Sequence, residues 1–447
     1  MANVTSTLTS IPSPTSFLSS LSLPSSLETT LSSLLASPLF AKASGASWKT
    51  YAVSVGVVYL ALCQALRFQR EKSMRHRYGF PDRASLRKMT VEDAQKIIKE
   101  LASLEFPQMS ETSLQFGLFK TYGVETISRL LLGTRNLTDP VASRKRYEDT
   151  GIIIGEFMAN PPNSARATTS VARMNWLHSK YIQSGQISNA DLLYTLSVFI
   201  TEPVRFARLY DWRPLNDMEH CAYGVFWKSI GDAMGIQYEG FLAKTEWADG
   251  LDFALDVAQW AKAYEVVAFK PSPISNKPAV ALIPMITYWV PRWAQSFTQE
   301  CVHVLLGDRV REAFLLPEPG IAAATFIYSS LWLRRLFLRH LSLPRVVRLK
   351  RHQEDTDAVD RPLHINWSYG NYPFYIKPTL WNRWGPGAWA VWLAGGKLPG
   401  EEPEEHLPKG FTFTDLGPLN RMGQGAEEMK KDFERMQAKG MGGCPFG

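Results

Sequence analysis

The sequence predicts an all-α protein that an N-terminal transmembrane helix anchors to a membrane. From about residue 90 onwards, apolar residues recur at three- and four-residue spacing, which is the period of an amphipathic helix. No stretch shows the sustained alternation of apolar and polar residues that is typical of a half-buried strand. One uncharged apolar stretch near the N-terminus is long enough to span a bilayer. These three observations predict a helical body tethered to a membrane.

The first segment, residues 1–47, is rich in Ser, Thr and Pro and carries only Glu28 and Lys42 as charges. Such a segment cannot bury enough apolar surface to fold alone, so we expect a disordered tail. The sequon that begins at Asn3 could be glycosylated if this tail is lumenal, which would make the chain a glycoprotein.

Residues 48–69 are predicted to form the transmembrane helix. The stretch 51–68 has no charge before Arg67 and is near the lower length limit for a span. Lys42 and Lys49 precede it, whereas five basic residues close its far end: Arg67, Arg70, Lys72, Arg75 and Arg77. By the positive-inside rule the tail is lumenal and the body cytosolic, as in a single-pass protein of the endoplasmic reticulum or another endomembrane. The alternative is a buried core helix.

Residues 80–345 are predicted to form the helical domain. Capping boxes predict three helix starts, at Thr90 with Asp93, at Ser188 with Asp191 and at Asn216 with Glu219. Residues 245–268 show helical periodicity as well. The apolar stretch 321–343 could be a second span, but its three arginines favour a helix at the membrane surface or along a substrate channel. Residues 346–447 are predicted to be a loosely structured extension that wraps the domain and ends in a short helix.

Composition excludes several classes of protein. With 447 residues, 45% of them hydrophobic, and 14 Trp, the chain can build a sizeable core in one domain or two. The net charge is +7, but the basic residues form no basic-aromatic repeat, so we expect no nucleic-acid partner. The four cysteines form no CxxC pair, which argues against a disulfide framework or a structural zinc site. The oligomeric state has no signal in the sequence.

His178 is the most informative candidate residue. It lies on a helical face rich in Trp and Leu, and Arg146 and Thr150 lie about one helix upstream. These two residues are four apart, so they share a helix face. A buried haem requires an imidazole for the iron and cationic or hydroxyl donors near the propionates or the bound oxygen. The alternatives are an ordinary core histidine and an exposed helix turn in the charged run 144–149.

From about residue 80 to 290 the chain resembles the fungal ER-bound oxygenases of mycophenolic acid biosynthesis. That family shares the catalytic domain of the bacterial latex-clearing rubber oxygenases. The motifs that carry the resemblance stand in one order: Lys120-Thr121-Tyr122-Gly123, Arg146-x-x-Asp149-Thr150, Arg173-Met174-Asn175-x-Leu177-His178, Asp191-Leu192-Leu193-Tyr194-Thr195-Leu196-Ser197, Glu202-Pro203-x-Arg205 and Trp227-Lys228-x-x-Gly231-Asp232-Ala233-Met234.

The resemblance implies a globin-like helical core and haem b, with His178 as the iron ligand. In the rubber oxygenases an Arg-x-x-Lys-Thr element lies about thirty residues before that histidine, and Arg146, Asp149 and Thr150 fall on it as catalytic candidates. Asp149 departs from the pattern, because the bacterial enzymes carry Lys there. If that Lys closes the sixth iron position in the relatives, this protein must leave the position open or fill it otherwise. Asp149 would then be a polar distal group or a solvated acid.

The implied activity is the cleavage of a carbon–carbon double bond by dioxygen, in a hydrophobic isoprenoid or meroterpenoid substrate of secondary metabolism. Such a substrate would reach the site from membrane lipid. Arg173, five residues before His178, is a candidate for holding a haem propionate or else a surface charge. Glu125 is a candidate distal carboxylate that no motif fixes.

Other functions remain open on the sequence alone. The main alternative is a haem-free membrane scaffold or lipid-binding protein that keeps the fold, and a weaker one is a haem oxidase or peroxygenase that cleaves nothing. Three rival sites are weak. Cys444, in Gly442-Gly443-Cys444-Pro445, resembles the cysteine loop of thiolate-ligated haem monooxygenases, but the long helix that must follow such a loop is missing. Cys301 with His303, and His220 with Cys221, have too few partners in sequence for a metal site. The sequence contains no DDxxD cluster, GxSxG elbow, Walker loop or GxGxxG.

Overall fold

The computed structural model describes residues 47–446, except 135–138, 289, 354–355 and 369–370. All regular elements among these residues are helices, accompanied by three isolated β-bridges, so the predicted all-α class is confirmed. The sequon at Asn3 and nearly all of the predicted tail lie outside the described residues.

The helices follow one another along the chain with these bounds: α4 (Trp48–Arg67), α5 (Gln69–Tyr78), η2 (Ser85–Lys88), α6 (Val91–Glu100), η3 (Leu101–Glu105), α7 (Pro107–Thr121), α8 (Glu125–Gly133), α9 (Pro140–Ala159), α10 (Ala165–Gln183), α11 (Asn189–Tyr210), α12 (Asp217–Met234), α13 (Gly250–Ala268), α14 (Pro273–Ile286), η4 (Arg292–Ala294), α15 (Gln295–Leu306), α16 (Asp308–Ala313), α17 (Ile321–Leu336), η5 (Phe337–Leu341), α18 (Leu380–Trp384), α19 (Pro386–Leu393), α20 (Pro403–His406), η6 (Phe413–Asp415), η7 (Leu419–Arg421) and α21 (Ala426–Lys439).

Local chemistry explains where several helices begin. The predicted capping boxes are present at Thr90, Ser188 and Asn216, where each side chain accepts a hydrogen bond from the main chain three residues later. The helix predicted over 245–268 begins later, at Gly250. Its start is set by Asp249, whose carboxylate accepts bonds from the N–H groups of Leu251 and Asp252.

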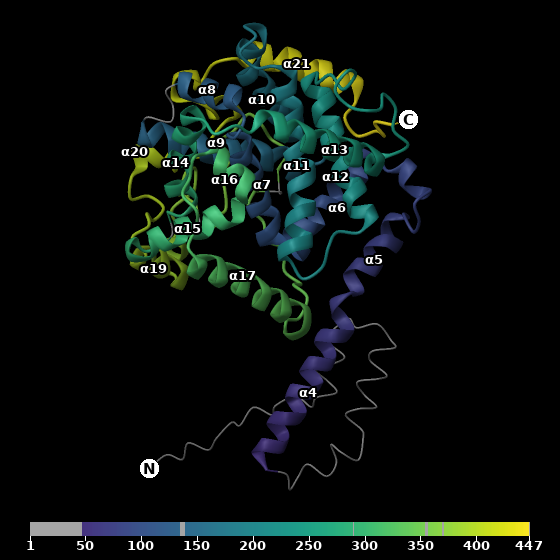
Figure 1. Cartoon of the computed structure of the whole chain (residues 1–447), viewed down its shortest axis with the longest axis vertical. Helices are drawn as coiled ribbons and strands as arrows, with labels where there is room; N and C mark the ends of the chain where they lie inside the picture. The colour runs from purple at the N-terminus through teal and green to yellow at the C-terminus, as the bar shows by residue number, and fades with distance from the viewer. Residues whose placement is uncertain (1–46, 135–138, 289, 354–355, 369–370, 447) are drawn as a thin grey trace, which may run out of the picture. The chain divides into compact units, whose positions relative to one another are not determined.

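The chain divides into two compact units, Met1–Ala65 and Leu66–Gly447. In the second unit α11 packs against α7, α12 and α13, while α12 also packs against α6 (Figure 1). Helix α10 lies between α9 and the C-terminal helix α21. These helices bury a continuous apolar core that includes large side chains such as Trp212, Trp227 and Tyr194.

The segment after residue 345 differs from the loose extension that the sequence predicted. Tyr375, Phe411 and Leu416 are fully buried in the main core, and α21 packs on α10. The segment therefore belongs to the body and supplies part of its core. The residues that it contacts lie far away in the sequence, so no local sequence pattern predicts this packing.

Within the described part of the chain, two apolar helices are long enough to cross a membrane, by length and composition: Trp48–Tyr78 and Ile321–Leu341. The first contains the predicted transmembrane helix, and α4 itself runs from Trp48 to Arg67. The second joins α17 to the π-helical turn η5.

Candidate functional site

A cavity of about 900 Å³ lies inside the body. This volume is near the upper end of the range for cofactor and ligand sites, roughly 300–1,000 Å³. Most of its wall is apolar and comes from α7, α9, α10 and α11, with further residues from 345–352, 366–368 and 417–421 and with Asn371. Four of the predicted site residues line it: Arg146, Asp149, Thr150 and His178. The structure thus brings together α9 and α10 residues that lie about thirty positions apart in sequence.

His178 stands in the wall of this cavity on α10. Its Nδ1 lies 2.7 Å from the carbonyl oxygen of Met174, one turn earlier, so Nδ1 carries the proton and donates it. Among the described residues nothing bonds to Nε2, which leaves a free lone pair on that nitrogen. Burial lowers the pKa of His178, and nearby Arg146 lowers it further, while the bond to Met174 opposes the shift. A neutral imidazole with one nitrogen held and the other free is the arrangement found in metal-ligating histidines.

Arg146 and Thr150 share one face of α9, as their spacing predicted. The Thr150 hydroxyl donates to the main-chain oxygen of Arg146 at 2.8 Å, so its proton is engaged and its oxygen can accept a bond. The Arg146 guanidinium makes one long contact, 3.4 Å from Nη1 to the hydroxyl of Thr134. Both side chains are half-buried and line the cavity, so they are not the solvated helix turn of the alternative interpretation.

Asp149 is a buried member of an ion pair. Its carboxylate is only 1% exposed and lies 2.5 Å from the ammonium of Lys145, which is also buried. It accepts two further bonds, from the Tyr375 hydroxyl at 2.8 Å and from the Gly417 N–H at 2.7 Å. The solvated-acid interpretation is therefore excluded. Gly417 has a φ of +116°, a conformation that favours glycine, and this turn aims its N–H at the carboxylate.

Glu148 is a buried acid that the sequence interpretation missed. It lines the same cavity, accepts bonds from Asn371 at 3.2 and 3.3 Å, and lies 3.3 Å from the guanidinium of Arg351. Burial raises the pKa of Glu148 to about 7, although Arg351 and Asn371 oppose the shift. A carboxyl that titrates near neutrality beside a cavity can donate or accept a proton there. The only signal in the sequence was an acid followed by the apolar run of α9.

Arg173 does not line the cavity, contrary to the role predicted for it. Its fully buried guanidinium donates to four main-chain carbonyls of the C-terminal segment, those of Thr414, Leu416, Arg421 and Gln424. With its donors taken by protein, the side chain is not placed to hold a propionate, and it fastens the C-terminal segment to α10 instead.

Glu125 also lies outside the cavity lining. It is on the first turn of α8 and pairs with Arg129 at 2.5 Å, one turn later. An exposed pair of this type stabilises a helix turn and does not act as a distal carboxylate.

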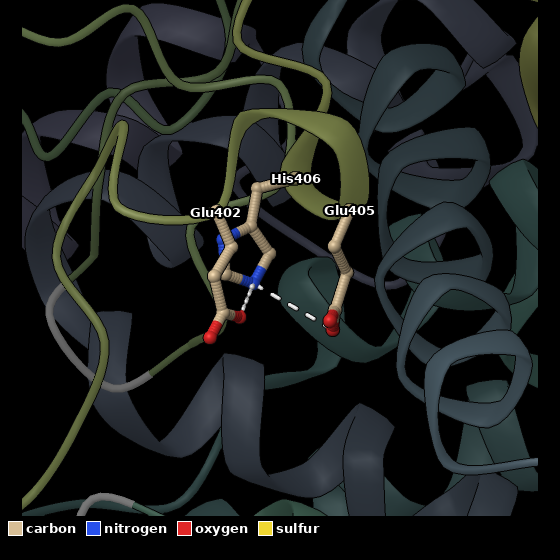
Figure 2. Close-up of side chains that lie close together, drawn as sticks. All are labelled: Glu402, Glu405 and His406. Carbon is tan, nitrogen blue, oxygen red and sulfur yellow. Dashed lines mark ion pairs between the residues drawn. The ribbon is translucent and has the colours of Figure 1, made fainter.

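The rival cysteine sites acquire no metal-ligand partners among the described residues. One cluster of three possible ligands does occur there, Glu402, Glu405 and His406 on and beside α20 (Figure 2). His406 is 1% exposed, and its Nε2 lies 3.9 Å from Glu402 and 3.8 Å from Glu405.

Both carboxylates of this cluster already face cations, because Lys397 is 2.6 Å from Glu402 and Arg144 is 2.8 Å from Glu405. The two negative charges are thus balanced, which leaves little attraction for a divalent ion. The cluster joins α20 to Arg144 on α9 and is separate from the cavity.

Comparison with known proteins finds similar oxygenases. Residues 137–339 match the family model described as "ER-bound oxygenase mpaB/B'/Rubber oxygenase, catalytic domain". The chain is 41% identical to ER-bound oxygenase mpaB' of Penicillium brevicompactum over 405 residues, which cover 89% of this chain and 95% of that protein. It is 40% identical to mpaB of the same organism over 374 residues, covering 83% and 88%. It is 42% identical to mpaB of Penicillium roqueforti (strain FM164) over 272 residues, covering 61% and 91%.

Proposed function

This chain belongs to the family of ER-bound oxygenases mpaB/B' and rubber oxygenases, and we propose that it is a haem-dependent, ER-bound oxygenase. Its reaction would cleave a carbon–carbon double bond in a hydrophobic isoprenoid or meroterpenoid substrate. The observation that carries the proposal is the neutral imidazole of His178, whose free Nε2 belongs to the wall of a large apolar cavity.

The described residues fit haem b. Nε2 of His178 is suited to bind the iron, because the bond from Nδ1 to Met174 fixes both the tautomer and the ring. The cavity is large enough for a cofactor and a ligand, and Arg146 and Arg421 supply cations in its wall for the propionates. When bound, haem supplies the activation of dioxygen, which amino-acid side chains cannot provide.

Arg146 and Thr150 have separate roles in this proposal. Arg146, with only one long contact, keeps donors available for a propionate or for a polar atom of the bound reactants. Thr150 offers a hydroxyl oxygen whose own proton is held by the helix. Asp149 acts as a positioning residue, because three donors already occupy its carboxylate. Its carboxylate is therefore engaged by protein and would hold neighbouring groups in place without binding the cofactor itself.

The apolar wall binds the substrate and excludes water. Side chains such as Leu131, Ile153 and Phe199 would hold an alkene by contact alone, which suits a prenyl chain without polar handles. The overall reaction balances without another reductant or oxidant: one alkene and one dioxygen give two carbonyl compounds, with one oxygen atom in each.

Spectroscopy of the purified full chain tests the cofactor. We expect the wild type to show a Soret band and a pyridine haemochrome, and His178→Ala to lose both while its far-UV circular dichroism stays the same. His220→Ala is the matched control, since this half-buried histidine does not line the cavity. A His178→Ala variant with full haem and an unchanged spectrum would contradict the ligand assignment. A wild type without haem would favour the haem-free scaffold.

Products test the chemistry. With a membrane-embedded polyprenyl lipid and ¹⁸O-labelled dioxygen, we expect carbonyl fragments that each carry one labelled oxygen. Hydroxylated or epoxidised products of unchanged carbon number would point instead to an oxidase or peroxygenase without cleavage.

A further inference from the structure

We propose that α17, η5 and residues 342–350 form a docking face that seats the body on an anionic bilayer surface and holds an opening of the cavity against the lipid. The attachment itself is independent of the catalytic chemistry. The route that it gives to a lipid substrate rests on the function proposed above.

The docking face has large apolar side chains that are strongly exposed. Trp332 is 60% exposed, Phe337 54% and Val346 88%. Others of the same kind along this face are Ile321, Phe326, Tyr328, Leu333, Leu341, Leu343, Val347 and Leu349. A continuous apolar surface of this length costs free energy in water and marks a binding surface.

Helix α17 is held flat on the body, so it does not cross the bilayer. It packs against α15, and Ala323 is fully buried in that contact. Near its end, Arg334 donates to the main-chain oxygen of Tyr210 at 3.3 Å and lies 3.6 Å from the buried carboxylate of Asp211. A transmembrane orientation would break these contacts and leave Asp211 without its partner. An apolar helix with one face on protein and the other uncovered fits the bilayer interface.

The positive charge of the docking face indicates which kind of membrane it binds. From residue 320 to 353 the sequence has no Asp or Glu, while four arginines besides Arg334 occur on the face: Arg335, Arg339, Arg345 and Arg348. Cationic side chains beside an apolar stripe match anionic phospholipid headgroups above acyl chains. We therefore assign a bilayer with anionic lipid as the occupant of this face.

The chain that leads to the anchor joins the body at the docking face. The guanidinium of Arg339 lies 5.8 Å from the ring of Phe68, the residue after α4. Arg70 donates to the main-chain oxygen of Arg345 and pairs with Glu105 at 2.7 Å. The body is thus tethered from the side that carries the apolar stripe, which keeps this side near the membrane.

The cavity opens at the same place. Gln108, Arg345 and Leu349 are exposed and also line the cavity. The Leu349 N–H donates to Ser103 at 3.1 Å, and this bond holds residues 345–350 as one wall of the opening. With the face on lipid, a prenyl chain could pass from the acyl layer into the cavity without crossing water.

A second group of exposed aromatic side chains belongs to helices in the C-terminal segment. Trp381, Trp384, Trp389 and Trp392 on α18 and α19 are all about half exposed or more. Figure 1 shows α19 (yellow-green) and α17 (green) at the lower end of the body. Tryptophan is the side chain most typical of the membrane–water interface, so these helices extend the proposed contact.

Spin labels on the full chain in nanodiscs test the docking face directly. In a Cys444→Ser background we would place nitroxides at Trp332→Cys and Val346→Cys, with Leu255→Cys and Val266→Cys on α13 as exposed apolar controls. In discs of phosphatidylcholine with phosphatidylserine, the first two are expected to be reached by dissolved oxygen and shielded from a water-soluble nickel chelate. The controls should behave in the opposite way. Equal aqueous exposure at all four positions would overturn the proposal, whether or not the protein holds haem.

An activity measurement tests the route to the cavity. The double variant Trp332→Glu/Phe337→Glu stays anchored through α4, so it should sediment with membranes and keep its haem. Its turnover of a membrane-embedded polyprenyl lipid is expected to fall about tenfold, while that of a short alkene added in water is unchanged. Leu255→Glu is the control. Equal turnover of the lipid by variant and wild type would overturn the route, and absence of turnover in the wild type would instead count against the proposed function.

Discussion

Replacing Arg173 by Met separates the structural role of this residue from the cofactor role that the sequence suggested. The methionine keeps an apolar stem of similar length on α10 but removes every donor of the guanidinium. Four main-chain carbonyls lose a bond of 2.6–3.0 Å. Those of Thr414 and Arg421 keep a second bond, from the N–H groups of Gly423 and Gln424, while those of Leu416 and Gln424 lose the bond that satisfies them. All four belong to residues 414–424, so the whole C-terminal closure is weakened at once.

The magnitude follows from these bonds. An unsatisfied buried carbonyl costs about 1–3 kcal/mol, and partial access of water favours the low end, so the carbonyls of Leu416 and Gln424 together give about 2 kcal/mol. The bonds lost by the carbonyls of Thr414 and Arg421, which each keep another donor, add about 1 kcal/mol each. The guanidinium also lies 4.5 Å from the ring of Trp176, and losing that contact adds about 0.5–1 kcal/mol. Burial lowers the pKa of Arg173 to about 10, so holding the charge has a cost that methionine removes. We expect Arg173→Met to lower the free energy of unfolding by about 3–5 kcal/mol, typical of a broken buried network.

Urea unfolding of the full chain in detergent, followed by circular dichroism, measures this loss. Limited proteolysis should also cleave the variant between residues 414 and 440 sooner than the wild type. Lys180→Met, an exposed position on the same helix, is the control. If Arg173→Met has the wild-type urea midpoint but loses haem, the structural reasoning is refuted and the propionate role is restored.

Two further changes probe the acids of α9. The pKa of Glu148 rises on folding from an ordinary 4.5 to about 7, so the folded protein takes up a proton between these values and stability falls as pH rises through them. Glu148→Gln should abolish this loss of unfolding free energy, which amounts to at most about 3 kcal/mol. If the free energy of unfolding of the variant depends on pH as steeply as that of the wild type, Glu148 is not the source of the dependence. Asp149→Asn should leave the buried Lys145 ammonium unpaired and destabilise by about 3–5 kcal/mol, whereas Lys145→Met/Asp149→Leu should recover at least half of it. If the free-energy changes of Lys145→Met and Asp149→Leu add up to that of the double variant, the two side chains do not interact.

The sequence predicted what short-range chemistry determines. A capping box joins residues three positions apart, so the helix starts after Thr90, Ser188 and Asn216 were readable from the chain alone. The same holds for helical periodicity and for the uncharged span. Placing Arg146, Thr150 and His178 on facing helices required the family motifs as well, since a lone histidine carries little information.

The contacts that sequence reasoning missed are long-range. Asp149 stayed ambiguous because the partners that bury it, Tyr375 and Gly417, lie 226 and 268 positions away. The charged run 144–149 looks like a solvated turn, yet Lys145, Glu148 and Asp149 are buried. Arg173 was misplaced for the same reason, because its acceptors are carbonyls and carbonyls carry no sequence signature.

These long-range contacts also determine what encloses the cavity. The family match ends at residue 339, but the wall continues with residues from 345–352, 366–368 and 417–421 and with Asn371. Residues 417–421 lie within the segment 414–424, to which Asp149 and Arg173 are hydrogen-bonded. Two buried charged residues of the matched domain therefore hold in place a part of the cavity wall that lies outside that domain. A chain that ended after residue 339 would keep His178, Arg146 and Thr150. Its cavity would be open to water, and Asp149 and Arg173 would lose their hydrogen-bond partners in residues 414–424. Keeping His178, Arg146 and Thr150 is therefore not enough for the proposed function, because the C-terminal segment completes the cavity that these residues line.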